Sequence, residues 1–181
     1  MILMAVLAAV TAPATDKIMV TAYDQLCVPG SPSQTVLSHA DQDGWQSSGP
    51  DKPKDFDVTA DRFKIFGTAI LRLNARDTNV PSARFVTCGI SVTTAQPDLA
   101  SDVQAMLGFA PAFHFGTSAN FFALRENGRW QDGSMLSGKD FAAAKAAGKF
   151  YSLLTLSHEG GACVLSFQAL PITQGKAAGA P

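Results

Sequence analysis

Charged residues are scarce in this sequence, and their scarcity excludes several classes of protein. Only 16% of the 181 residues are charged, 46% are hydrophobic, and the formal net charge is −1. This composition supplies enough apolar material for one folded core and too little charge for a disordered chain. It also lacks the basic field that attracts nucleic acids or anionic membrane surfaces. We therefore expect a single domain that binds no nucleic acid.

Tyrosine and tryptophan are also rare, with 2 of each against 12 phenylalanines. Protein-binding surfaces favour Tyr and Trp. We therefore expect most of the phenylalanines to lie in the core.

Long hydrophobic runs are missing beyond the N-terminal segment. Residues 2–10 form one apolar run that is too short to cross a bilayer as a helix, and residues 12–14 (Ala-Pro-Ala) supply the small side chains of a signal-peptidase site. Because no Lys or Arg precedes the run, a buried N-terminal strand or helix is the alternative. We predict a signal peptide over residues 1–14 and a periplasmic or secreted protein with no membrane span after signal removal.

No two of the three cysteines form a CxxC motif. This spacing excludes a thioredoxin-like redox motif and a zinc knuckle. In an oxidising compartment two of them can pair. Cys27 precedes a predicted helix and Cys88 lies on the apolar face of a predicted strand, so we expect a Cys27–Cys88 disulfide that ties the helix to the sheet. A bridge to Cys163 and a chain without any bridge are the alternatives, and an unpaired Cys163 is expected to be a buried thiol.

Start and stop residues predict a helix between Ser31 and Gly44. Ser31 and Gln34 have the spacing of a capping box with a proline between them, and Gly44 is a C-terminal stop onto which the next residue, a tryptophan, can fold back. The flanking segments are predicted to be irregular chain (15–30) and a polar loop (46–60).

Apolar residues alternate with polar ones in two later segments, 63–73 and 84–92, which predicts two strands. The turn-rich residues 74–82 join them, so the simplest arrangement is an antiparallel pair.

Two more helices are predicted downstream. Pro97 opens one that ends at Gly108, and Ser137, with Asp140 in the capping-box position, opens a short one that ends at Gly148. The first has apolar residues at helical spacing: Leu99, Val103, Met106 and Leu107.

Hairpins account for the rest of the chain. An Asn-Gly pair at 127–128 suits a type I′ turn at the end of segment 113–130, and strands 149–156 and 162–169 form a last hairpin. The whole pattern predicts an α+β fold: an antiparallel sheet of about five to six strands built from hairpins, with two to three helices packed on one face. This single domain is expected to span residues 15–173, before a disordered tail over 174–181.

A cluster of aromatic residues is the main candidate for a binding surface. Phe113, His114, Phe115, Phe121 and Phe122 flank a Gly-Thr-Ser segment, and aromatic walls of this kind hold apolar ligands or exposed protein segments. The alternative is that they belong to two core strands that enter a turn.

Catalytic and metal-binding motifs are missing. The histidines His39, His114 and His158 lie far apart, with no HExxH spacing, and no GxSxG elbow or phosphate-binding glycine loop occurs. Residues 41–44 (Asp-Gln-Asp-Gly) have the centre of a calcium loop, but the position of its bidentate Glu falls on Pro50. We interpret 41–44 as a helix end, and predict no metal and no cofactor.

Several structural features together resemble small exported proteins of alphaproteobacterial type. These are Cys27, the helix ending at Gly44-Trp45, Cys88 on a strand, and LASDVQAMLG at 99–108. The resemblance covers residues 27–108. It implies export and the Cys27–Cys88 pair, and it carries no activity, because none is established for that group.

The sequence thus predicts an exported non-enzymatic module that binds an envelope protein partner or a small apolar ligand. A periplasmic hydrolase that uses His114 or His158 in a spatially assembled site is one alternative. A structural component of a cell-envelope assembly is the other.

Overall fold

The computed structural model describes residues 14–28, 32–49, 52–54, 57–80 and 83–170. Its helices are α1 (Thr15–Leu26), α2 (Ser33–Gln42), α3 (Leu99–Leu107) and α4 (Gly138–Ala146). Its strands are β1 (Gln46–Ser47), β2 (Lys52–Lys54), β3 (Asp57–Phe66), β4 (Ala69–Val80), β5 (Ala83–Val92), β6 (Phe113–Phe115), β7 (Ser118–Glu126), β8 (Arg129–Asp132), β9 (Phe150–His158) and β10 (Gly161–Leu170). Apart from Ala14, the predicted signal peptide lies outside the described residues, as does the predicted tail.

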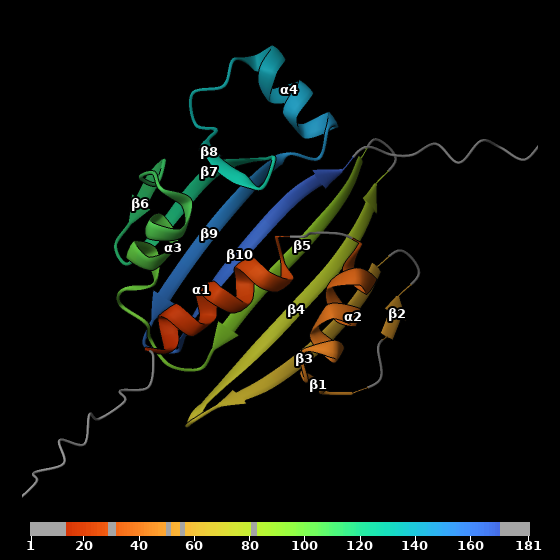
Figure 1. Ribbon diagram of the computed structural model, residues 1–181, viewed down its shortest axis with the longest axis vertical. Coiled ribbons are helices and arrows are strands. Elements are labelled where there is room, and N and C mark those ends of the chain that lie inside the picture. The colour runs from red at the N-terminus through yellow and green to blue at the C-terminus, as the bar shows by residue number, and fades with distance from the viewer. Residues whose placement is uncertain (1–13, 29–31, 50–51, 55–56, 81–82, 171–181) are drawn as a thin grey trace, which may run out of the picture.

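The strands join in one antiparallel sheet (Figure 1), whose main path runs β1-β3-β4-β5-β10-β9-β7-β6, with β2 paired to β3 and β8 paired to β7. The last hairpin, β9–β10, lies in the middle of the sheet between β5 and β7. The predicted α+β class is confirmed. The described part of the sheet has ten strands, however, where about five to six were expected.

The sequence predicted too few strands because several predicted segments were given the wrong ends. Gly67 has a φ of +59°, a conformation that favours glycine, and it turns the chain between β3 and β4. The single strand predicted over 63–73 is therefore two, and the second continues through the predicted turn 74–82 as far as Val80. The predicted loop 46–60 contributes β1, β2 and the start of β3. Its polar composition hid these strands, because short edge strands pair through their backbones and need no apolar face.

The largest departure is α1. Residues 15–30, expected to be extended or irregular, are helical up to Leu26. No side chain caps the helix at Ala14, so the sequence carries no start signal there. Its buried residues nevertheless recur at helical spacing: Met19, Val20, Ala22, Tyr23 and Leu26. The packing of this face, rather than a local cap, stabilises the helix.

The second helix takes its N-terminal cap from a distant strand. It begins at Ser33, and the backbone N–H of Ser33 donates to Asp77 Oδ1 (3.0 Å) on β4. Asp77 is buried, and its other oxygen accepts from Arg84 Nη2 at 2.6 Å. The predicted capping residue, Ser31, lies outside the described residues. Tertiary contact therefore supplies the cap that local sequence was expected to supply.

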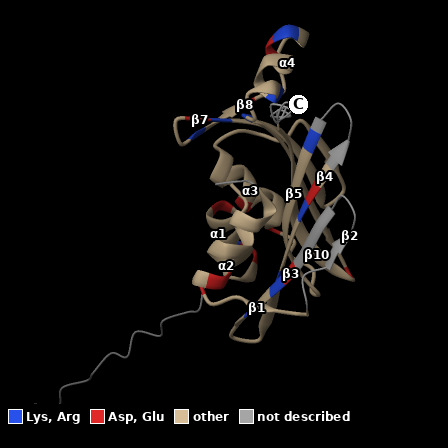
Figure 2. Ribbon diagram, turned by 90° about the vertical axis from the view of Figure 1, so that its right-hand side faces the viewer, with Lys and Arg blue, Asp and Glu red and all other residues tan. Residues whose placement is uncertain are grey.

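Three helices cover one face of the sheet. In Figure 2, α1, α2 and α3 lie on the same side of the strands, whereas α4 lies beyond the end of the sheet near β8. The largest fully buried side chains fill the space between these layers: Met19, Tyr23, Leu71, Leu73, Ile90, Leu99, Phe121 and Leu153. The prediction of helices on one face is confirmed for α2 and α3. It is wrong for α4, and α1, which was not predicted as a helix, lies on that face as well.

Most of the phenylalanines do not lie in this core, contrary to the expectation. Among the described residues only Phe121 and Phe150 are buried, while Phe113, Phe115 and Phe167 are exposed. The reason is that many of them point to the other face of the sheet, which α1, α2 and α3 do not cover (Figure 2). At one end of that face, Phe150 is buried against Phe141 of α4.

The predicted disulfide is confirmed. Cys27 and Cys88 are bonded, with their Cα atoms 5.5 Å apart. The bridge joins the end of α1 to β5, so it anchors α1 as well as the start of the chain that leads to α2. The alternative pairing with Cys163 is wrong, because Cys163 is a free, half-buried thiol on β10 whose pKa is raised by burial.

Local signals in the second half of the chain are also confirmed. The strand predicted over 84–92 is β5, and α3 ends at Gly108 with a φ of +83°. The Ser137 hydroxyl accepts from the Asp140 backbone N–H (3.3 Å) at the start of α4. Asn127 has a positive φ, as a type I′ turn requires between β7 and β8.

Candidate functional site

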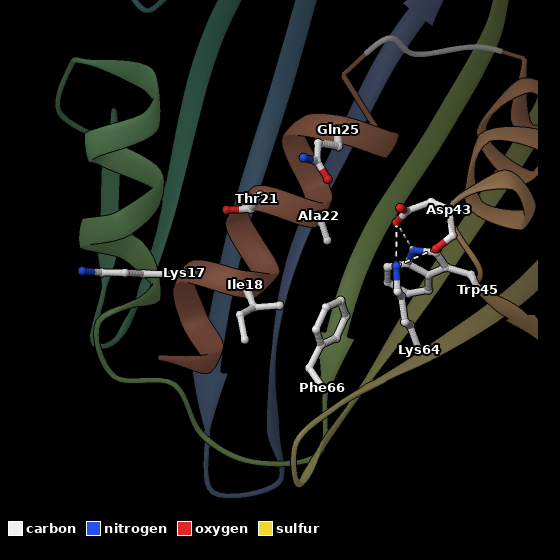
Figure 3. A pocket seen from close by; sticks show the side chains of 9 residues that line it. All are labelled: Lys17, Ile18, Thr21, Ala22, Gln25, Asp43, Trp45, Lys64 and Phe66. Carbon is white, nitrogen blue, oxygen red and sulfur yellow. Dashed lines mark hydrogen bonds and ion pairs between the residues drawn. The ribbon is translucent and has the colours of Figure 1, made fainter. Parts of the chain in front are cut away.

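A groove on the helix-covered side separates α1 from the junction of α2 and β3 (Figure 3). It encloses about 400 Å³. We call it the α1 groove, and its lining residues come from α1, from the turn after α2 and from the end of β3: Lys17, Ile18, Thr21, Ala22, Gln25, Asp43, Trp45, Lys64 and Phe66.

Helical spacing produces the α1 wall of the groove. Ile18, Ala22 and Gln25 follow one another at intervals of four and three residues, so they lie on one face of the helix. Ala22 is buried but short, which leaves space in front of it. The ring of Phe66 at the end of β3 faces Ile18 across the opening (Figure 3). These side chains give the groove its apolar walls.

The opposite wall depends on how α2 ends. Gly44 adopts a φ of +79°, and the Trp45 backbone N–H donates to the carbonyl oxygen of Ala40 (2.9 Å). This left-handed ending reverses the chain after the helix and brings the Trp45 indole inward, where it is only 4% exposed. The predicted glycine stop and the return of Trp45 are confirmed.

An ion pair closes one end of the groove. Lys64 Nζ lies 2.9 Å from Asp43 Oδ2, and Trp45 Nε1 donates to the same oxygen at 3.2 Å. The hydrogen bond from Lys64, which outweighs partial burial, lowers the pKa of the Asp43 carboxyl. The Lys64 ammonium also lies 5.4 Å from the centre of the Phe66 ring, within cation–π range. The polar end of the groove is therefore charge-balanced.

This arrangement can hold a molecule, but its described residues include no pair of groups poised for acid–base chemistry. Among them Asp43 is the one carboxylate in the lining, and Lys64 neutralises it. Lys17 points away from the groove toward α3 (Figure 3). The walls suit an apolar body, and the hydrogen-bonding groups at the rim suit an uncharged polar end.

The aromatic residues proposed from sequence are divided between two faces of the sheet. Phe113 and Phe115 are 52% and 67% exposed on the edge strand β6. Phe121 is fully buried beneath the helices, and the adjacent Phe122 points to the opposite face, where it is half-buried. His114 is exposed on β6. Since neighbouring strand residues point to opposite faces, these five residues cannot line a single surface.

The histidines lie apart on the surface. His39 is exposed on α2 and His114 on β6, while His158 Nδ1 accepts from the Gly160 backbone N–H (3.0 Å) in the turn after β9. In the described ranges, no histidine is hydrogen-bonded to a carboxylate, and no cluster of three metal-ligating side chains occurs. A hydrolase site centred on His114 or His158 stays a prediction.

Residues 41–44 form the end of α2 instead of an ion-binding loop. Asp41 accepts from Arg62 Nε on β3 (2.6 Å), and Asp43 is held by Lys64. Both carboxylates therefore attach the end of α2 to the sheet. This agrees with the interpretation of these residues as a helix terminus.

Sequence reasoning missed the α1 groove, because it treated residues 15–30 as irregular. The helical spacing of Ile18, Ala22 and Gln25 is the signal that was available. Lys64 and Phe66 gave no such signal, because their contribution depends on where the β3–β4 turn falls.

Within the described residues, no helix combines the length and hydropathy needed to span a membrane. Comparisons of the chain with protein-family models, with curated proteins and with solved structures found no match.

Proposed function

We propose that the protein is an exported, non-enzymatic module that binds a small apolar ligand in the α1 groove. The observation that carries the proposal is the composition of this groove: apolar walls from Ile18, Ala22 and Phe66 that end at the neutral Lys64–Asp43 pair. Its volume of about 400 Å³ falls in the usual range for ligand pockets. A ligand with an apolar body and an uncharged polar end matches both features.

Two features support export. The Cys27–Cys88 disulfide is of a kind that persists in oxidising compartments and is rare in the cytosol. The apolar run at residues 2–10 and the small residues at 12–14 have the composition of a signal peptide. Export would place the α1 groove in the periplasm or outside the cell, where it could take up a sparingly soluble compound.

Trp45 lines the groove and offers a direct test. The chain has 2 tryptophans, so Trp130→Phe leaves Trp45 as the only indole reporter. We expect a medium-chain bromoalkanol to quench Trp45 fluorescence in a saturable manner, because bromine quenches indole on contact. Quenching that rises linearly without saturation would contradict the proposal.

A filled groove provides the matched comparison. In the Trp130→Phe background, Ala22→Leu extends a side chain into the α1 groove, and we expect binding to weaken about tenfold, or about 1.4 kcal/mol. Ala105→Leu makes the same change on the exposed side of α3 and should leave the affinity unchanged. Equal affinities for the two variants would place the ligand elsewhere.

A further inference from the structure

The second face of the sheet, opposite the α1 groove, is apolar over four neighbouring strands. We call the surface formed there by β5, β10, β9 and β7 the outer face. At one end of it Phe150 is buried against Phe141 of α4. Its other large apolar side chains are half-buried or exposed: Phe85, Phe122, Leu124, Leu154, Leu156, Leu165 and Phe167. The polar side chains in its central part are uncharged: Thr87, Ser91, Asn120 and Ser152. Charge enters at the end of β7, where Glu126 pairs with Lys149.

An antiparallel sheet that carries helices on one face normally presents a polar face to water on the other. Here charged side chains on this side of the sheet are concentrated on β3 and β4, where Asp61 and Arg72 lie. The middle strand, β10, contributes Leu165 and Phe167, and Phe167 is 44% exposed. The outer face therefore has the composition of a covered surface.

Gly89 leaves room for a neighbouring side chain at the centre of the outer face. A Cβ atom at this position would lie 2.8 Å from Leu165 Cδ1, so the Leu165 side chain lies across the glycine. Apolar sheet faces pack against one another at about 10 Å.

The dimensions also fit a protein interface. Four strands about 4.8 Å apart, each contributing about seven residues at about 3.4 Å, cover a projected area of about 500 Å². Monomeric proteins rarely leave a contiguous apolar patch larger than this, and a standard interface buries about 800 Å² of accessible surface on each partner. The exposed Phe113 and Phe115 on β6 extend the apolar surface at its rim.

We propose that the outer face packs against the same face of a second copy of this chain, sheet on sheet, about a two-fold axis. The described residues in the centre of the outer face offer no charge to a charged partner, whereas an uncharged apolar surface is complementary to itself. The proposal goes beyond the α1 groove, which lies on the opposite side of the sheet, and the two sites can be occupied together.

The strand order suggests where the axis lies. An axis along the strands, between β10 and β9, places β5 opposite β7 and β4 opposite β6. Arg72 and Phe115 lie in the same row of residues across the sheet. From β4 to β9 this row runs through Arg72, Ser91, Cys163 and Leu156. It continues across β7 to Phe115 on β6. Arg72 of one copy would then meet the exposed Phe115 ring of the other, a favourable cation–π arrangement at the rim.

Sedimentation velocity of the purified protein tests the proposal. We expect a dimer whose fraction rises with protein concentration. Leu154→Lys and Phe167→Lys should each raise the dimer dissociation constant about tenfold or more, because a lysine would be buried without a partner. Met135→Lys replaces an apolar side chain that is 91% exposed outside the outer face and should leave dimerisation unchanged. A monomer at every concentration, or a dimer that both outer-face lysines leave intact, overturns the proposal.

A measurement on the wild-type protein covers the case in which a lysine variant fails to fold. Cys163 lies on the outer face, in the row that joins Ser91 to Leu156, so its rate of labelling by a maleimide reports coverage of this surface. We expect labelling to slow as the protein concentration rises and the dimer forms. A rate independent of concentration overturns the proposal. Slow labelling of a monomer would also overturn it, because another part of the same chain would then cover this face.

Discussion

The two faces of the central sheet carry similar amounts of apolar residues but have different environments. On the helix-covered face, Leu73, Ile90 and Val164 are fully buried beneath α1, α2 and α3. On the outer face, the intervening residues Leu165 and Phe167 are half-buried and exposed. The comparison teaches that these strands carry apolar residues on both faces. Only the residues on the helix-covered face form the core of a single chain.

Removing cysteines gives the largest expected difference in stability between the two faces. The disulfide closes a 61-residue separation, and replacing both Cys27 and Cys88 with alanine should lower the free energy of unfolding by about 4 kcal/mol. Cys163→Ala, on the outer face, should cost less than about 1 kcal/mol because this thiol has no covalent partner. Urea denaturation at low protein concentration measures both, and equal losses would contradict the distinction.

Leucine truncations compare the two faces directly. Leu73→Ala empties a fully buried site and should lower the free energy of unfolding by about 3 kcal/mol. Leu154→Ala removes a half-buried side chain from the outer face and should cost about 1 kcal/mol in the monomer. Chemical denaturation measured below the dimer dissociation constant is the appropriate assay. A larger loss for Leu154→Ala would mean that the outer face is already covered within one chain.

Two aspartates provide the same comparison for polar groups. Asp77→Ala removes the cap of α2 and leaves the Ser33 N–H and Arg84 without this partner, so we expect a loss of about 2 kcal/mol. Asp61 lies on the solvent side of β3 and accepts from Asn74 Nδ2 (2.6 Å). Asp61→Ala should cost less than about 0.5 kcal/mol. Thermal unfolding followed by circular dichroism would show the ranking, and a reversed order would be inconsistent with a tertiary cap.

The smallest effect concerns the polar end of the α1 groove. The pKa of Asp43 is lowered mainly by its hydrogen bond with Lys64. The stability from this pair is therefore present above the ordinary pKa of an aspartate, and it is lost as the pH falls through the lowered value. Because Asp43 is 55% exposed, the contribution is less than about 0.5 kcal/mol.

Carboxyl chemical shifts in an NMR titration report this pKa directly. Lys64→Met should move the Asp43 pKa upward, toward the ordinary range, while Lys149→Met, at the distant Glu126 pair, should leave it unchanged. An Asp43 pKa that does not respond to Lys64→Met would refute the assignment of its cause.

Local signals account for the elements that sequence reasoning placed correctly. Ser137 caps α4, Gly108 ends α3 and Asn127 turns the β7–β8 hairpin, each through atoms a few residues away. Cys88 was placed correctly as well, because its strand alternates without interruption. Where the signal is not local, the prediction failed: Asp77 caps α2 from 44 residues away, and packing rather than a cap stabilises α1.

In the candidate site, too, features set by local sequence were predictable and features set by tertiary contacts were not. The end of α2 at Gly44 and Trp45 was predictable, because a helix stop acts within one turn. The meeting of Ile18 with Phe66 was not, because it depends on α1 being a helix and on the β3–β4 turn falling at Gly67.

The sequence by itself determined the α+β class and the ends of two helices, since spacing and caps operate over short stretches of chain. It favoured the Cys27–Cys88 bridge, and the tertiary structure decided against Cys163 as a partner. Only the tertiary structure decided that β10 lies beside β5 and which face of the sheet the helices cover. The physical reason is that β10 has apolar residues on both faces. Such a strand buries apolar side chains whichever of its faces the helices cover. The elements that pack against it therefore decide which face becomes the core.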